Sequence, residues 1–478
     1  MTKMIANRLL LLFTLAGLGV LPPPTAAQTP AASAPRQTFS LQDALQYATD
    51  HYPSVKAAIE EVNASSAGVN VAKAAALPRL DGVWQTNRAT VNNVTGLLLP
   101  QSVVPGISGP PLLDASSRSA WGTAAGALFT WEPFDLGLRA AEVRSAEAAL
   151  TRARASEGLT RLEVEAAVAS AFLAVVQAEQ AVTATQADVD RRTLLARAAQ
   201  TLANNQLRPG AEASRADAEL AAARTRSILA RQDLVLAQAS LARFLGVPDG
   251  LAGVNAAPLL ASVAPAAPPT TDTATAHPLL QVRQAAVEVA RAQEEVLADT
   301  NRPRLFVQSA LFARGSGAAF NGTLDGGASG LWFDRANWAA GFQVVFPNLF
   351  EIPSLRARRA ASAATMRAET ARYDEAQLLV TSQQRAATAI TDAARAVAAN
   401  TPVQLAAARQ GEGQASARYQ AGLASIVEVA DAQSLLAQAE YQDAVARVGI
   451  WRALLGEAVA RGDLAPFRAL ASSAGGVR

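Results

Sequence analysis

A short segment near the C-terminus carries the acidic residues whose spacing could do chemistry. In YQAGLASIVEVADAQ, residues 419–433, Glu428 and Asp431 are three residues apart and follow Gly422. Residues three apart share one face of a helix, so the two carboxylates would point in one direction. Carboxylates at a helix N-terminus also interact favourably with the helix dipole, which leaves a purely stabilising role as an alternative. Whether the carboxylates have a functional role or only stabilise the helix depends on where the surrounding helices and strands place this segment.

The residues needed for enzymatic chemistry do not come together in this sequence. The chain has no cysteine, which excludes thiol catalysis, thiolate metal sites and disulfides. The two histidines, His51 and His277, lie beside prolines and have no thiolates or acid clusters near them, so they do not indicate a metal site. No Ser/His/Asp arrangement, phosphate-binding glycine loop or dinucleotide fingerprint is present. We therefore expect no enzyme, no cofactor and no bound metal.

The composition is unusual for a chain of 478 residues. Half of the residues are apolar, yet only 5% are aromatic, and alanine is abundant. A thick hydrophobic core cannot be built mainly from alanine. The formal net charge is +2, and the basic residues are scattered among similar numbers of acids, which argues against a nucleic-acid partner.

The N-terminus has the features of a secretory signal peptide. Residues 1–27 combine a short basic stretch, an apolar run and small residues around Ala27. The run is short for a membrane-spanning helix of about 20 residues, which is the alternative interpretation. Export is therefore expected, and the absence of cysteine predicts no lipid anchor on an N-terminal cysteine. Because no later apolar run is long enough to span a bilayer as a helix, membrane entry would require a barrel.

The chain contains an internal duplication. Residues 51–80 return as residues 277–305 with both prolines in register, and two later segments of each copy also resemble each other. A Pro/Ala/Thr-rich stretch separates the copies. We assign residues 28–246 to a first repeat, 247–276 to a linker, 277–456 to a second repeat and 457–478 to a C-terminal tail.

Each repeat reads as helix, strand, loop, strand, very long helix, turn and long helix. From Leu136 to about Asn205 there is no proline and, after Gly137, a single glycine, so roughly 70 residues, or about 100 Å, can be helical. No globular core is that deep. The expected elements are strands at about 80–91 and 120–131 with a helical hairpin at 136–246, and strands at about 305–316 and 336–346 with a helical hairpin at 353–456.

Two of the strands alternate cleanly and place aromatic residues on one face. The ends of such a face are about ten residues apart, or roughly 33 Å, which becomes about 25 Å in a strand tilted as in outer-membrane barrels. A half-buried soluble strand is the alternative, and the strands at 80–91 and 305–316 alternate poorly. Four strands cannot close a barrel, so membrane insertion would require oligomerisation. The candidate lipid-facing aromatics are Trp121, Phe129, Trp131, Trp338, Phe342 and Phe346.

These features together resemble one protein family. The signal peptide, the duplicated unit, the PRL entry into the first strand of both copies and the pattern Y-x-x-G-x-x-S/T-x-x-[DE]-x-x-D-A are similar to those of the TolC-like outer-membrane efflux proteins, the outer membrane factors. The resemblance covers about residues 38–460. It implies a mainly α fold with a small β part. Three chains would form a twelve-stranded β-barrel in outer-membrane lipid, continued by an α-helical periplasmic tunnel. The channel would give passive exit, in efflux or type I secretion, to substrates delivered by an inner-membrane transporter and a periplasmic adaptor.

The resemblance also implies roles for the segment at 419–433. It would form the turn between the two long helices of the second repeat at the periplasmic tip, with Gly422 providing backbone freedom. Glu428 and Asp431 would line the pore constriction as stacked acidic rings that favour cations. Tyr419 matches a tyrosine that helps to latch the closed tip. Ala424 occupies a position where a basic latch residue can occur.

The first repeat has an equivalent turn in QLRPGAEASRADAE, which we place at Gly210. Asp217, the nearest acid in our alignment of the repeats, is displaced by one position, so we do not assign it to the constriction. The main rival interpretation is a soluble periplasmic scaffold or adaptor with helical hairpins. The aromatic strands at 120–131 and 336–346 are the features that favour a channel.

Overall fold

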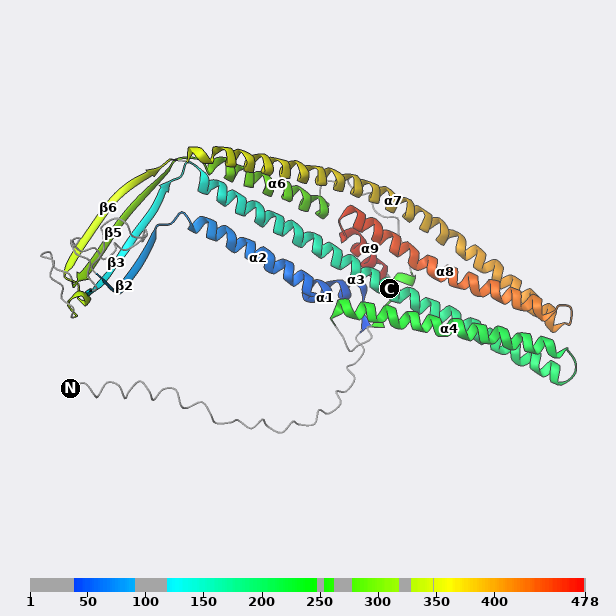
Figure 1. Cartoon of the computed structure of the whole chain (residues 1–478). Coiled ribbons are helices and arrows are strands. Elements are labelled where there is room, and N and C mark those ends of the chain that lie inside the picture. Colours follow the sequence, from blue (N-terminus) through cyan, green and yellow to red (C-terminus); the bar gives the residue numbers. More distant parts are fainter. Residues whose placement is uncertain are drawn as a thin grey trace, which may run out of the picture. The chain divides into compact units, whose positions relative to one another are not determined.

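The computed structural model describes residues 38–90, 118–246, 253–261, 277–317, 328–346 and 348–476. The expected signal peptide, residues 1–27, lies outside these ranges, as does most of the expected linker. Long helices dominate the described part of the chain, and one four-stranded antiparallel sheet lies at one end of them (Figure 1). The expected mainly α fold with a small β part is confirmed.

Short helices precede each sheet segment, and local sequence explains where they begin. Ser40 starts α1 with a capping box, in which its hydroxyl accepts from the backbone N–H of Asp43 and the Asp43 carboxylate points back. α2 and α6 both begin with proline, which needs no N–H partner at that position. β1, Thr38–Phe39, pairs in parallel with β4, Gly253–Val254. The helices are α1 Leu41–His51, α2 Pro53–Ala74, α5 Ala257–Ala261 and α6 Pro278–Asp299.

Four long helices form two antiparallel hairpins. At 1.5 Å per residue, the 67 residues of α3 extend about 100 Å. α3 packs along α4, and α7 packs along α8 (Figure 1). α3 also packs along α8, so the lateral order is α4, α3, α8, α7. The helices are α3 Leu138–Asn204, α4 Gly210–Leu245, α7 Ile352–Gln420 and α8 Ile426–Arg461.

The two hairpins are equivalent with a shift of 216 residues. α4 and α8 both contain 36 residues and begin at Gly210 and Ile426. Both end at a left-handed glycine, Gly246 and Gly462. The turns before them occupy 205–209 and 421–425. Residue n at the tip of the first hairpin therefore corresponds to residue n + 216 of the second.

The second hairpin runs further than the sequence indicates. We expected it to close near Gly456, but α8 passes through this glycine and ends at Gly462. The reason is that Gly456 keeps a helical backbone, while Gly462 adopts φ 78°. The expected tail at 457–478 contains the last turns of α8 and the helix α9, Ala465–Gly476. Phe467 of α9 is buried edge-on against Trp451 of α8.

A histidine joins the start of α6 to the end of α8. The Nδ1 atom of His277 accepts from the backbone N–H of Leu279 at 3.1 Å, so its Nε2 carries the proton and donates to the Val459 carbonyl at 3.3 Å. Burial lowers the pKa of His277. Gly462 packs so closely here that an added Cβ would lie 2.5 Å from Cδ of Pro278.

The largest core cluster lies where α3 meets α1, α4, α8 and α9. Apolar residues of α3 recur at steps of three and four residues, as in a coiled-coil seam. They are buried from Val164 to Ala178, and Val182 is half-buried. α3 packs on several helices at this level, so the seam does not serve a single partner helix. No helix in the described ranges is long and apolar enough to cross a bilayer.

The sheet is antiparallel throughout and has the strand order β2, β3, β5, β6. The two edge strands are therefore β2 and β6. Two short 3-10 helices, η2 Ser329–Leu331 and η3 Leu349–Glu351, flank β6 in the chain. The strands are β2 Arg79–Thr90, β3 Ser119–Phe134, β5 Arg304–Ser316 and β6 Arg335–Val345.

Candidate functional site

One face of the sheet is apolar and exposed. Residues paired across antiparallel strands share a face, and Phe342 pairs with Val307, which pairs in turn with Trp131. The side chains of Trp338 and Phe342 are 79% and 80% exposed in the single chain. We call this surface the apolar face, and it carries Leu80, Trp84, Trp121, Phe129, Trp131, Val307, Leu311, Trp338 and Phe342.

The opposite face of the sheet is more polar. Gln308 pairs with Gly341, and Arg314 pairs with Arg335, so polar side chains from β5 and β6 lie on the same side. Val83 and Phe306 also fall on this face, which explains why β2 and β5 alternate poorly in sequence. The polar face carries Arg79, Asp81, Gln85, Gln308, Arg314, Arg335, Asn337 and Gln343.

The register thus brings five of the six candidate aromatics together on the apolar face. Phe346 follows β6, which ends at Val345, and its side chain is exposed. Leu80, Trp84 and Leu311 were not singled out from the sequence. Only the register identifies them, because their own strands lack a clean alternation.

The acidic pair lies at the start of α8. Ser425 caps this helix, and Glu428 closes a capping box with it through two hydrogen bonds of 3.4 Å. Glu428 therefore performs the helix-stabilising role of the alternative interpretation. Asp431 follows one turn later, and both carboxylates are exposed while Val429 and Ala430 between them are buried. An exposed acidic face at a helix tip is compatible with a pore lining.

The structural equivalence corrects our pairing of the two tips. In the first tip the left-handed residue is Gln206, with φ 58°, and it corresponds to Gly422, with φ 76°. Gly210 lies in the first turn of α4 and not in the bend. The counterpart of Glu428 is Glu212, whereas Asp217 corresponds to Gln433. Because these helices are rich in alanine, sequence similarity alone does not show which residues of the two tips correspond. The equal lengths of α4 and α8 establish this correspondence.

The tips of the two hairpins share a buried apolar cluster, and three side chains beside it connect the two hairpins; we call these three the tip contact. Tyr419 is buried, and its hydroxyl donates to a Glu212 carboxylate oxygen at 3.4 Å. The Arg208 guanidinium lies 5.3 Å from the centre of the Tyr419 ring and 3.7 Å from Glu212. Burial, followed by the neighbouring Glu212 carboxylate, raises the pKa of Tyr419.

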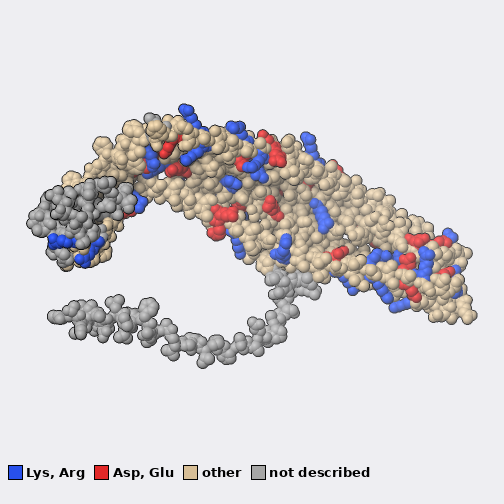
Figure 2. Space-filling model, viewed as in Figure 1, with Lys and Arg blue, Asp and Glu red and all other residues tan. Residues whose placement is uncertain are grey.

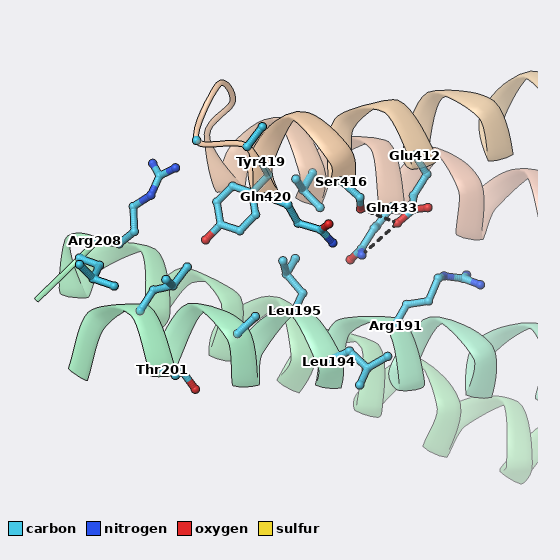
Figure 3. Close-up of a pocket in the computed structure, with 16 residues that line it drawn as sticks. Arg191, Leu194, Leu195, Thr201, Arg208, Glu412, Ser416, Tyr419, Gln420 and Gln433 are labelled. Atoms are coloured by element: carbon cyan, nitrogen blue, oxygen red, sulfur yellow. Dashed lines mark hydrogen bonds between the residues drawn. The ribbon is translucent and has the colours of Figure 1, made fainter. Parts of the chain in front are cut away.

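Arg208 of the first tip is the structural equivalent of Ala424 of the second. The first tip therefore carries a basic residue at the position where the second has an alanine. Figure 3 shows Arg208 and Tyr419 at one end of a cleft of about 940 Å³ between the hairpins. Arg191, Glu412 and Gln433 line its other end.

About 20 Å behind the tips, two consecutive arginines of α3 reach α8; we call these contacts the α3–α8 clamp. Arg191 binds both carboxylate oxygens of Glu440, at 3.3 and 2.7 Å. Arg192, whose side chain is only 2% exposed, donates to Ser434 at 2.9 Å. It also binds Asp188 and, in α4, Glu219, each at 2.9 Å.

The clamp was not identified from the sequence. Two adjacent arginines in a long helix read as an exposed face, and their partners lie up to about 250 residues away.

The end of the molecule that carries both hairpin turns shows interspersed basic and acidic side chains (Figure 2). Among the described residues, no group of three His, Cys, Asp or Glu side chains could hold a metal ion.

Comparisons with known proteins agree with this architecture. Residues 44–247 match the family model for outer membrane efflux proteins. No curated protein sequence gives a significant match. The outer membrane protein VceC from Vibrio cholerae is 18% identical, with a TM-score of 0.70 over 88% of this chain and 96% of VceC. The Campylobacter jejuni outer membrane channel CmeC is 14% identical, with a TM-score of 0.73 over 93% of this chain and 94% of CmeC.

The outer-membrane channel OprN gives a similar result, with 17% identity and a TM-score of 0.69 over 94% of this chain and 98% of OprN. These similarities extend over both hairpins and the sheet, whereas the family model covers the first repeat. Residues 44–247 match the outer membrane efflux protein family, and the whole chain shares the fold of TolC-like outer-membrane channels. This is a family of outer-membrane channels and not of enzymes.

Proposed function

We propose that three copies of this chain form a passive exit channel, with twelve strands closing a barrel in outer-membrane lipid. The single observation that carries the proposal is the amphipathic sheet joined to two long hairpins. Its edge strands β2 and β6 are antiparallel to their neighbours, so β6 of one chain can pair with β2 of the next. The family forms trimers that work with efflux pumps, and the apolar face would contact lipid while the polar face lines the lumen.

The long hairpins would then form a tunnel that crosses the periplasm. A periplasmic adaptor and an inner-membrane transporter would deliver substrates to its tip. The channel needs no cofactor, because conduction is passive and the energy comes from the transporter. The described helices are long enough for this role, since α3 alone extends about 100 Å.

We further propose that Glu428 and Asp431 form the constriction. Three copies would place six carboxylates around the axis, where they attract cations and repel anions. The tip contact of Tyr419 with Arg208 and Glu212 would hold the two tips of each chain together. Outward movement of residues 205–217 and 419–431 would separate the acidic rings in an iris-like opening.

The test is the single-channel conductance of the purified, detergent-solubilised protein in a planar bilayer. We expect a small, cation-selective conductance that loses cation preference at acidic pH, because carboxylates become protonated. Glu428→Ser with Asp431→Ser should increase conductance and abolish the preference. Glu60→Ser with Glu61→Ser, which removes the same charge from exposed positions of α2, should change neither.

Two results would contradict the proposal. If the Glu428/Asp431 variant kept the conductance and ion preference of the wild type, the constriction would lie elsewhere. If the protein stayed in solution without detergent and gave no conductance, a periplasmic scaffold would replace the channel. Cell fractionation of the full chain distinguishes the two functions independently, because a channel would be found in the outer-membrane fraction and a scaffold in the soluble periplasmic fraction.

A further inference from the structure

The free end of the sheet, away from the helices, carries an arginine on the apolar face. β2 begins after α2 at Arg79 and runs away from the helices, so Arg88 lies near the free end (Figure 1). Arg88 pairs with Trp121 and follows the same alternation along β2 as Trp84. A charged side chain therefore shares a face with the exposed aromatic residues of the sheet.

The contacts of Arg88 leave its charge available to an anion. Its Nε atom donates to the Ser119 hydroxyl at 3.0 Å, and its guanidinium carbon lies 5.6 Å from the centre of the Trp121 ring. Among the described residues no carboxylate forms an ion pair with it, and the side chain is exposed. Both of these partners are uncharged, so they orient the guanidinium without neutralising it.

Arg88 lies where the apolar face ends. Just before it, the face becomes polar at Thr86, whose hydroxyl is 3.0 Å from that of Thr123. Trp121 and Trp131 lie about 33 Å apart along β3, or about 25 Å in a tilted strand, which is the height of the lipid-facing band of an outer-membrane barrel. Because the helices would cross the periplasm, the free end of the sheet would lie in the outer leaflet. Arg88 would then be at the level of the lipid headgroups, where an arginine costs little.

A closely packed loop adds aromatic surface beside Arg88. Gly315 continues the alternation of the apolar face on β5. A Cβ at Gly315 would lie 1.8 Å from the carbonyl oxygen of Trp332. Likewise, a Cβ at Gly330 would lie 1.8 Å from the carbonyl oxygen of Trp121. The chain around η2 therefore packs directly on the end of β3 and β5 because both positions are glycine, and it leaves the Trp332 side chain exposed.

Building on the proposed barrel, we propose that Arg88 binds a phosphate group of an outer-leaflet lipid, with Trp121 and Trp332 in contact with the same lipid. Ser119 uses only the Nε atom, so both Nη groups can donate to phosphate oxygens, the ligand that a guanidinium matches best. The apolar face continues directly below Arg88 and would contact the acyl chains. Lipid A, the phosphorylated lipid of bacterial outer leaflets, has this combination of groups. Such a contact would fix the height of the barrel in the membrane.

Lipid binding by the purified protein in neutral detergent provides the test. Lipid A should raise the melting temperature of the wild type, and the concentration dependence of this increase gives a Kd. Lipid A without its phosphates should bind at least about tenfold more weakly, because a charge-assisted hydrogen bond is lost. Arg88→Gln should weaken the binding of intact lipid A by a similar factor. Arg88→Lys keeps the charge but not the fork of donors, so its affinity should lie between the two.

Arg314→Gln is the matched control, because Arg314 lies near the same end of the sheet on the polar face. It should bind lipid A with the affinity of the wild type but change the ion selectivity in a planar bilayer. Arg88→Gln should show the reverse, with weaker lipid binding and unchanged selectivity. If Arg88→Gln changed the selectivity and kept the lipid affinity, Arg88 would face the lumen and the inference would be wrong.

The remaining outcomes separate the inference from the proposed function. If phosphate-free lipid A bound the wild type as tightly as intact lipid A, the phosphate contact would be refuted while the channel stands. If inorganic phosphate stabilised the wild type as well as lipid A at equal concentration, the site would bind a free anion and not a lipid. If the wild type did not conduct and stayed in solution without detergent, the proposed channel itself would fail.

Discussion

Arg192 should be the most sensitive charged residue of the long helices. Its side chain is 2% exposed and is held by Asp188, Glu219 and Ser434. Asp188 is itself 3% exposed and keeps a second partner, Arg226, if Arg192 is removed. Loss of one partner of a buried pair costs about 3 to 5 kcal/mol, and the remaining arginine places Arg192→Met near the lower value, about 3 kcal/mol.

A surface pair provides the matched control. Arg144 binds Glu295 at 3.0 Å, but both side chains are about half exposed. Arg144→Met should therefore cost less than about 1 kcal/mol. Arg192→Met combined with Asp188→Leu removes both buried charges and should lie within about 1 kcal/mol of the wild type.

The assay is urea denaturation of the detergent-solubilised protein, followed by the helical circular dichroism signal. We expect the wild type, Arg144→Met and the double variant to lie within about 1 kcal/mol of one another, and Arg192→Met to be clearly the least stable. If Arg192→Met lost no more stability than Arg144→Met, burial would not control the strength of this network. If the double variant were less stable than Arg192→Met, an unpaired Asp188 would not be the cause of the loss.

Three further predictions follow from single positions. Burial lowers the pKa of His277, so below about pH 6.5 the native state binds fewer protons than the unfolded state. The free energy of unfolding should therefore fall as the pH drops through this range. In melting curves recorded at several pH values, His277→Asn should flatten this dependence. Gly462→Ala should lower the melting temperature more than Gly246→Ala, because both glycines have positive φ but only the first would meet close neighbours. Phe342→Arg on the apolar face should reduce the yield of membrane-inserted trimer, with a cost of about 2 to 4 kcal/mol, whereas Gln343→Arg on the polar face should preserve the yield and change ion selectivity.

Local sequence signals were enough to predict the order of the elements. Ser40 and the prolines at the starts of α2 and α6 define helix beginnings, and the absence of proline defines the length of α3. The aromatic alternation of β3 and β6 likewise predicts their shared face. These signals act within a few residues, so no knowledge of the tertiary structure is needed to see them.

Features that depend on pairing between distant segments could not be predicted in the same way. Gly456 and Gly462 are both plausible helix ends, and only the contact of Gly462 with the start of α6 distinguishes them. Arg191 and Arg192 resemble any other exposed basic pair until α8 is placed beside α3. The pairing of alanine-rich helices is especially hard to predict, because alignments that differ by one or a few residues look alike in sequence.

The same alanine content makes the few polar contacts between the two hairpins important. An alanine seam lets helices approach closely, but each side chain buries little area and does little to fix one helix laterally against another. Lateral order between the hairpins therefore depends on a small number of long side chains, such as Tyr419 and Arg191. The two hairpins of the duplicated unit have the same length at the tip, but only one copy carries each of these side chains. The two copies are therefore chemically unequal although their backbones are alike.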